Sequence, residues 1–163
     1  MKIPFNEEQT FRKSWVMYLI PIFVAIPIYG IYQQYVLGEP FGNKSMSDIG
    51  LFSLLFFSLG IVVFIWMIKL STKIDEFQIK MNFYPLTSKT VHWSEIKTAE
   101  VINYGFVGGW GIRLWTKFGT VYNISGKKGL AIELNNGKKF LIGTQKESEL
   151  KAVLKSLKTT QEH

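Results

Sequence analysis

The stretch that decides the fold is Ile49 to Leu70, IGLFSLLFFSLGIVVFIWMIKL, which carries no charged side chain before Lys69. A helix rises about 1.5 Å per residue, so this stretch spans roughly 30 Å, the thickness of the hydrocarbon core of a bilayer. It therefore predicts a transmembrane helix at about residues 49–70. The chain then divides into a membrane segment, residues 1–70, and a domain outside the bilayer, residues 71–163.

A second apolar stretch, WVMYLIPIFVAIPIYGIYQQYVL at residues 15–37, comes first and predicts another span. Pro21 and Pro27 lie inside it, and proline is tolerated in membrane helices whose freed carbonyls find other partners. The polar loop 38–48 is too short for a further crossing, so the two spans form a hairpin. A cleaved signal peptide is the rival interpretation. The apolar run is longer than the usual signal core, and no small-residue cleavage site follows it.

The first residues, before the spans, contain a capping-box pattern in which Asn6 precedes Gln9 by three positions. This pattern predicts a short interfacial helix that leads into the first span. A frayed tail is the alternative.

The basic residues near the span ends predict the orientation of the hairpin. They lie mainly outside the two outer ends, at Lys2, Arg12, Lys13, Lys69, Lys73 and Lys80, whereas the connecting loop has only Lys44. Both termini of this multi-pass protein are therefore expected on the cytoplasmic side of the membrane. Neither span holds an ionisable side chain before Lys69, which argues against a transport path.

The net charge of +7 lies entirely on residues 69–163, because residues 1–68 hold four basic and four acidic side chains. A basic domain beside an anionic leaflet is attracted to it electrostatically. Nucleic acid is the other polyanion to consider. No basic helix or aromatic–basic RNA motif is visible, so no nucleic-acid partner is expected.

After residue 70 the pattern changes to short alternating segments that predict about seven strands. They fall at 71–74, 77–83, 97–104, 110–115, 120–125, 130–134 and 139–143, with 84–92 as a loop or irregular strand. Asn136-Gly137 is a strong hairpin signal between the last two. Thr144 and Glu147 then form a capping box ahead of an apolar stripe at Leu150, Val153, Leu154 and Leu157. The expected class is α+β: a strongly bent antiparallel sheet or barrel capped by a C-terminal helix.

Several segments together resemble a group of uncharacterised bacterial membrane proteins with two transmembrane helices and a bacterial pleckstrin-homology-like (PH-like) domain. They are PFGNKSMSD between the spans, KIDEFQIKMNFYP after them, and WSEI, GGWGIR, VYNISGKKGLAIEL and NGKKFLIGTQK further on. The resemblance covers nearly the whole chain. It implies the fold, the two-span topology and a place in the inner membrane of a bacterial cell, and it implies no agreed activity.

The residues needed for enzymatic chemistry are scarce. Cysteine is absent, which excludes thiolate nucleophiles, disulfides and cysteine-ligated metals. His92 has Ser94 and Glu95 close in sequence, but a catalytic triad is defined by geometry across a fold. We expect His92 to be a polar residue at a strand entrance. No carboxylate cluster suggests a metal site, so the sequence predicts a protein that is not an enzyme and has no cofactor.

Two glycine-containing segments are candidate binding sites. Gly108-Gly109-Trp110-Gly111 allows close approach of a ligand, although a bend between strands with Trp110 in the core is favoured. Ser125-Gly126-Lys127-Lys128-Gly129 is either an anion-binding nest or a solvated turn, and the turn is favoured. The candidate basic face for an anionic headgroup or partner consists of Arg113, Lys117, Lys127, Lys128, Lys138 and Lys139.

Three functions remain as hypotheses. The first is a membrane-anchored binding or scaffold module that presents its PH-like domain to a protein partner or to further copies of itself. The second is sensing of anionic lipid headgroups by the basic face. The third is an accessory subunit of a membrane enzyme or transporter, which the missing intramembrane charges and catalytic cluster disfavour.

Overall fold

The structure, a computed structural model, describes residues 5–13, 15–42 and 46–161. It separates into two compact units: one combines Met1–Thr10 with Ile68–His163, and the other is Phe11–Met67. The first is α+β and the second is helical. The helical unit is thus inserted into the α+β unit, and the N-terminal residues belong to that unit instead of to the membrane segment 1–70. Lys2 and Lys44 of the charge analysis lie outside the described residues.

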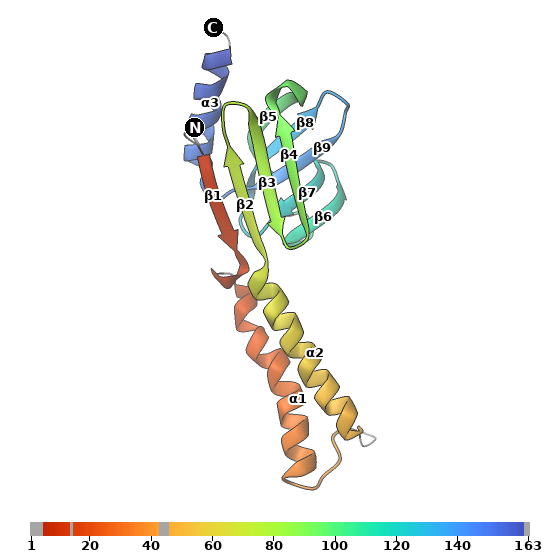
Figure 1. Cartoon of the computed structure of the whole chain (residues 1–163). Coiled ribbons are helices and arrows are strands. Elements are labelled where there is room, and N and C mark those ends of the chain that lie inside the picture. Colours follow the sequence, from red (N-terminus) through yellow and green to blue (C-terminus); the bar gives the residue numbers. More distant parts are fainter. Residues whose placement is uncertain (1–4, 14, 43–45, 162–163) are drawn as a thin grey trace. The chain divides into compact units, whose positions relative to one another are not determined.

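The helical unit consists of two helices, α1 (Ile20–Tyr35) and α2 (Asp48–Met67), which lie side by side in Figure 1. Two short 3₁₀ turns, η1 (Phe11–Lys13) and η2 (Trp15–Tyr18), precede them. A side chain on Gly30 would come within 3.0 Å of Leu51, so this glycine lets the two helices approach closely. Arg12 donates a hydrogen bond to the Trp66 carbonyl over 3.3 Å and lies 4.6 Å from the Trp66 ring centroid.

The predicted pair of spans is corrected in one respect. Among the described residues only α2 is long and apolar enough to cross a membrane, because α1 has 16 residues instead of covering 15–37. Pro21 is the second residue of α1, in the first turn, where the missing N–H costs nothing. The 3₁₀ turn η2 ends at Tyr18, before the helix begins. Lys69 and Leu70, the end of the predicted second span, belong to a strand.

Sheet A has the order β1-β2-β3-β4 and is antiparallel throughout. Its strands are β1 (Phe5–Thr10), β2 (Lys69–Ile74), β3 (Gln78–Tyr84) and β4 (Thr87–His92). The predicted N-terminal helix is wrong, since β1 pairs with β2 across the helical insertion. Burial alternates along β1: Phe5, Glu7 and Gln9 are buried, whereas Asn6 and Glu8 are exposed. This period of two is typical of a strand and is compatible with the spacing that resembled a capping box.

Sheet B has the order β5-β8-β9-β7-β6. Its strands are β5 (Ile96–Asn103), β6 (Gly111–Thr116), β7 (Gly119–Asn123), β8 (Lys128–Leu134) and β9 (Lys139–Gly143). The hairpin predicted at Asn136-Gly137 is confirmed by the antiparallel β8–β9 pair. The expected single bent antiparallel sheet or barrel of about seven strands is wrong. The described residues form nine strands in two sheets, and β7 pairs with β9 in parallel.

The core lies between the two sheets. Phe83 of sheet A and Tyr122 of sheet B have ring centroids 6.4 Å apart, and Gln9 of β1 donates a 2.8 Å hydrogen bond to the Gly143 carbonyl of β9. The C-terminal helix α3 (Glu147–Gln161) was predicted correctly, and its stripe residues Leu150, Leu154 and Leu157 are buried. A smaller apolar cluster at Tyr104, Val121 and Leu141 occupies the opposite face of sheet B.

Candidate functional site

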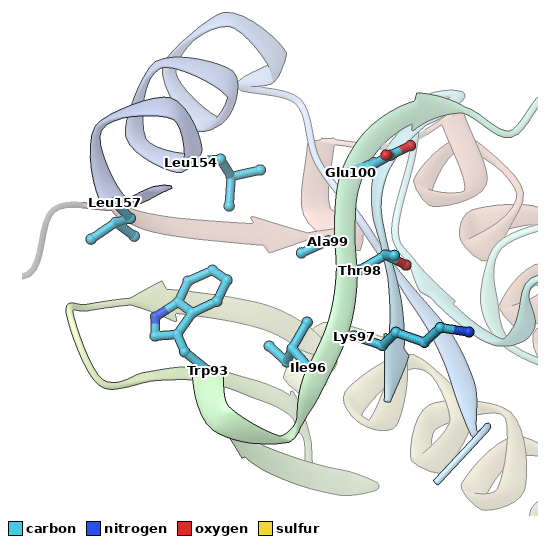
Figure 2. Close-up of a pocket in the computed structure, with 8 residues that line it drawn as sticks. All are labelled: Trp93, Ile96, Lys97, Thr98, Ala99, Glu100, Leu154 and Leu157. Atoms are coloured by element: carbon cyan, nitrogen blue, oxygen red, sulfur yellow. The ribbon is translucent and has the colours of Figure 1, made fainter. Parts of the chain in front are cut away.

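A groove lies between β5, an edge strand of sheet B, and helix α3. Its volume is about 210 Å³. Five side chains point into the groove: Trp93, Ile96, Ala99, Leu154 and Leu157. Three side chains of β5 point away from it, as Figure 2 shows: Lys97, Thr98 and Glu100. We call this the β5–α3 groove. Its wall is therefore apolar, and Thr98 and Glu100 line a different pocket, on the other side of β5.

The β5 wall of the groove is fixed at its start by a short 3₁₀ turn, η3 (Trp93–Glu95). The Trp93 indole donates a 2.9 Å hydrogen bond to the Asp75 carbonyl, which holds the ring in place. Asn135 donates from its side chain to the Ser94 carbonyl and from its backbone to the Glu95 carbonyl. His92, which we expected at a strand entrance, is instead the last residue of β4, and its backbone N–H donates a hydrogen bond to the Glu95 carboxylate over 2.9 Å.

The α3 wall is held by a buried carboxylate from the other end of the chain. Glu7 on β1 is 4% exposed and accepts hydrogen bonds from the Thr144 hydroxyl and from the backbone N–H of Gln145, the latter over 2.7 Å. These two donors lie immediately before α3, where the helix dipole favours a negative charge. The N-terminal strand therefore positions the helix that forms one wall of the groove.

An ion-pair cluster at the first turn of α3 also helps to hold the helix in place. Lys151 and Lys128 both contact Glu147, at 2.7 and 3.2 Å. Their hydrogen bonds, first from Lys151 and then from Lys128, lower the pKa of the Glu147 carboxyl. This cluster is exposed, so it stabilises the helix modestly.

The β5 strand gives the groove its chemical character. Along one edge it pairs with β8, and no described strand pairs with its other edge. An unpaired strand edge presents N–H and C=O groups to another extended chain. At about 210 Å³ the groove is smaller than pockets that enclose small-molecule ligands, about 300–1,000 Å³. It suits the side chains of an extended peptide better than a substrate.

The predicted basic face does not come together. Lys127 and Lys128 lie at the start of β8. Lys139 pairs with Glu133 near the other end of β8, where it lines a pocket with Lys117, and Lys138 precedes it in the chain. The seven residues of β8 separate the two groups by roughly 20 Å. Arg113 lies apart from both groups on β6, an edge strand of sheet B, where it is the cross-strand partner of Val121 in the middle of β7.

Two of these cations are already paired. Lys128 contacts Glu147, and Lys139 contacts Glu133 at 3.0 Å. Hydrogen bonds from Lys97 and then Lys139 lower the pKa of the Glu133 carboxyl. The Arg113 guanidinium lies against Gly109, where a side chain would come within 2.3 Å of it. The glycine-rich segment is thus a bend between β5 and β6 that also makes room for Arg113.

Sequence reasoning missed two surfaces. On the outside of sheet A, Lys73 of β2 and Lys80 of β3 are cross-strand partners. The alternating pattern on both sides of the Asp75-Glu76 turn indicates such a cross-strand pair. In the sequence, these lysines served only to indicate the orientation of the membrane hairpin. At the end of β6, Trp115 is 94% exposed with a φ of 55°. The irregular register between Arg113 and Thr116 turns the Trp115 side chain outward, and no sequence pattern predicts this irregularity.

The part of the chain that the structure describes holds no group of three or more His, Asp or Glu residues placed to bind a metal ion. No family model, curated protein or solved structure matches the chain. The resemblance to two-span PH-like proteins stays a prediction.

Proposed function

We propose that this protein is a membrane-anchored, non-enzymatic binding module that presents a PH-like domain at the cytoplasmic face of a bacterial inner membrane. The domain binds an extended segment of a protein partner in the β5–α3 groove. The observation that carries the proposal is the unpaired edge of β5 beside an apolar groove. The PH-like assignment is supported by two facing sheets and a C-terminal helix that packs on them.

Membrane anchoring is supported by the exposed apolar surface of the helical unit. Helix α2 has 20 residues, is long and apolar enough to cross a membrane, and is for the most part not buried inside the protein. Large apolar side chains that are mostly exposed lie along both helices, among them Ile22, Tyr29, Ile49, Phe56 and Phe57. Contiguous apolar surface of this kind is unfavourable in water and favourable in lipid.

The pairing of β1 with β2 supports two crossings instead of one. Thr10, which ends β1, and Lys69, which begins β2, are cross-strand partners. The chain between them leaves and rejoins one sheet, so it crosses a bilayer an even number of times. Besides α2, the 4 residues of η2 and the 16 of α1 are available for a crossing. At about 2.0 and 1.5 Å per residue they reach roughly 32 Å.

The topology predicts opposite labelling of two single cysteines, a clean test because the chain has no native cysteine. In intact cells, a membrane-impermeant maleimide should label Glu39→Cys in the α1–α2 loop and leave Asn136→Cys in the β8–β9 hairpin unlabelled. Permeabilised cells should label both. Labelling of Asn136→Cys in intact cells would reverse the orientation, and equal labelling of both would contradict two crossings.

The occupant of the groove is argued from its shape and lining. An extended chain can pair with β5 through its backbone, and its alternate side chains then face the groove. Because Trp93, Leu154 and Leu157 line the inside, those side chains should be apolar. Attachment to a membrane confines both proteins to one surface and raises their effective concentration, so a short segment suffices.

The groove is tested by photo-crosslinking in cells, with a benzophenone amino acid in place of Ile96, whose side chain points into the groove at the start of β5. We expect a crosslink that maps to one extended segment of a partner. Ala99→Val fills the groove at a position that is 7% exposed and should reduce the crosslink at least fivefold. Ala131→Val on β8 is the matched control, since Ala131 packs with the cluster on the other face of sheet B.

Two outcomes would overturn the groove proposal. One is an equal crosslink yield in Ala99→Val and Ala131→Val, because the bound segment would then not enter the groove. The other is a crosslink that maps only to this chain's own residues, which would make the contact self-association. Melting temperatures of both variants, measured beforehand, ensure that the comparison is between folded proteins.

A further inference from the structure

The outer face of sheet A carries two directly opposed lysines on its central strands. Lys73 of β2 and Lys80 of β3 are cross-strand partners on the exposed face. Like charges directly opposite each other destabilise a sheet. Lysines on edge strands prevent aggregation, but the edges of this sheet are β1 and β4. Edge protection therefore does not explain this pair.

The two lysines line a hollow of about 350 Å³, the largest of the cavities described here. We call it the outer hollow, and its other lining residues are Asn6, Glu8, Lys69, Ser71 and Asn82. In Figure 1 sheet B lies behind sheet A, and neither sheet B nor α3 covers this face. Its volume falls within the range of ligand pockets, in contrast to the β5–α3 groove.

The charges of the outer hollow favour an anion. Glu8 is its one carboxylate, and Lys69 already contacts it at 3.4 Å. Among the described residues Lys73 and Lys80 form no ion pair, so two positive charges stay uncompensated. Asn6, Ser71 and Asn82 add neutral hydrogen-bond donors around them. Ammonium groups beside amide and hydroxyl donors are suited to the oxygens of a phosphate group.

We propose that the outer hollow binds a phosphate group, held by Lys73 and Lys80 and oriented by Asn6, Ser71 and Asn82. The ligand neutralises the opposed lysines and so removes the cost that they impose on sheet A. The site is separate from the β5–α3 groove and does not depend on it. The phosphate belongs either to an anionic phospholipid headgroup or to a soluble phosphate compound. Lys69 follows the end of α2 by two residues, close in the chain to the lipid surface that the proposed anchoring implies.

Lysine acetylation of the full-length chain in nanodiscs tests the site. A bound phosphate covers the ammonium groups and holds them protonated, so their acetylation by an N-hydroxysuccinimide ester slows. Mass spectrometry follows each lysine separately, and Lys127 in the exposed turn before β8 is the internal control. We expect Lys73 and Lys80 to be acetylated at least threefold more slowly relative to Lys127 when phosphate is available, and the effect to vanish in 0.5 M salt.

Two arms distinguish the sources. Nanodiscs with phosphatidylglycerol, without added phosphate, test the lipid headgroup. Neutral phosphatidylcholine nanodiscs with added inorganic phosphate test the soluble ligand. Lys80→Gln should abolish the protection of Lys73, whereas Lys127→Gln should leave it intact. Protection in neither arm, or equal slowing of Lys127 in both, would overturn the proposal and leave these lysines as a solvated face.

Discussion

Replacement of Gly119 by alanine should prevent the α+β unit from folding stably. Gly119 begins β7 with a φ of 76°, and an added side chain would come within 1.9 Å of the Lys139 carbonyl on β9. That neighbour is backbone, so relief requires that the parallel β7–β9 pair separate at its start. We expect a loss of about 4 kcal/mol or more in the free energy of unfolding, or no folded protein at all. Pulse proteolysis across a urea series in mild detergent measures it.

The matched control is Gly137→Ala in the β8–β9 hairpin. Gly137 has a similar φ of 80°, but no atom lies within 4 Å of the added side chain. This variant bears only the cost of the left-handed backbone conformation, about 1–2 kcal/mol. Equal losses in the two variants would mean that the close β7–β9 approach does not determine the stability of sheet B.

Replacement of Glu7 by alanine should detach the N-terminal strand from helix α3. The carboxylate is buried and accepts from the Thr144 hydroxyl and the Gln145 N–H, so its removal leaves both donors without their partner. Unmet buried donors cost about 1–3 kcal/mol each, and we expect a total loss of about 2–4 kcal/mol. Hydrogen exchange should accelerate in α3 and β1 before the centre of sheet B.

Glu8→Ala is the control for this change, one residue along the same strand. Glu8 faces outward, and its contact with Lys69 at 3.4 Å joins two exposed side chains. Such a pair contributes about 0–1 kcal/mol, so the stability of this variant should stay near that of the parent protein. A loss as small in Glu7→Ala would show that the buried carboxylate does not secure the helix.

Local patterns predicted the elements that depend on near neighbours. The C-terminal helix followed from leucines at helical spacing, and the β8–β9 hairpin followed from Asn136-Gly137 between two alternating segments. In both cases the residues that pack together are close in the chain, so the sequence pattern and the packing carry the same information. The candidate site was harder, because its walls come from β5 and α3, about fifty residues apart.

The predicted basic residues illustrate why a list of lysines is not a site. Lys128 and Lys139 each have a glutamate partner, and they lie towards opposite ends of β8. Lys73 and Lys80, which were not proposed as ligands, meet because two strands pair in one particular register. Register is set by pairing across strands, and a single strand does not reveal it.

The sequence by itself determined the apolar helix from Asp48 to Met67, the strand-rich character of the following residues and the amphipathic α3. These depend on hydrophobic periodicity, which each segment carries within itself. Only the tertiary structure decided that residues 5–10 form a strand and that β7 and β9 run parallel. Phe5 pairs with β2, Gln9 bonds to β9, and Glu7 accepts from residues that precede α3. Such distant contacts outweigh the weak local preference for a helix. For the same reason the β5–α3 groove and the outer hollow exist only in the folded chain.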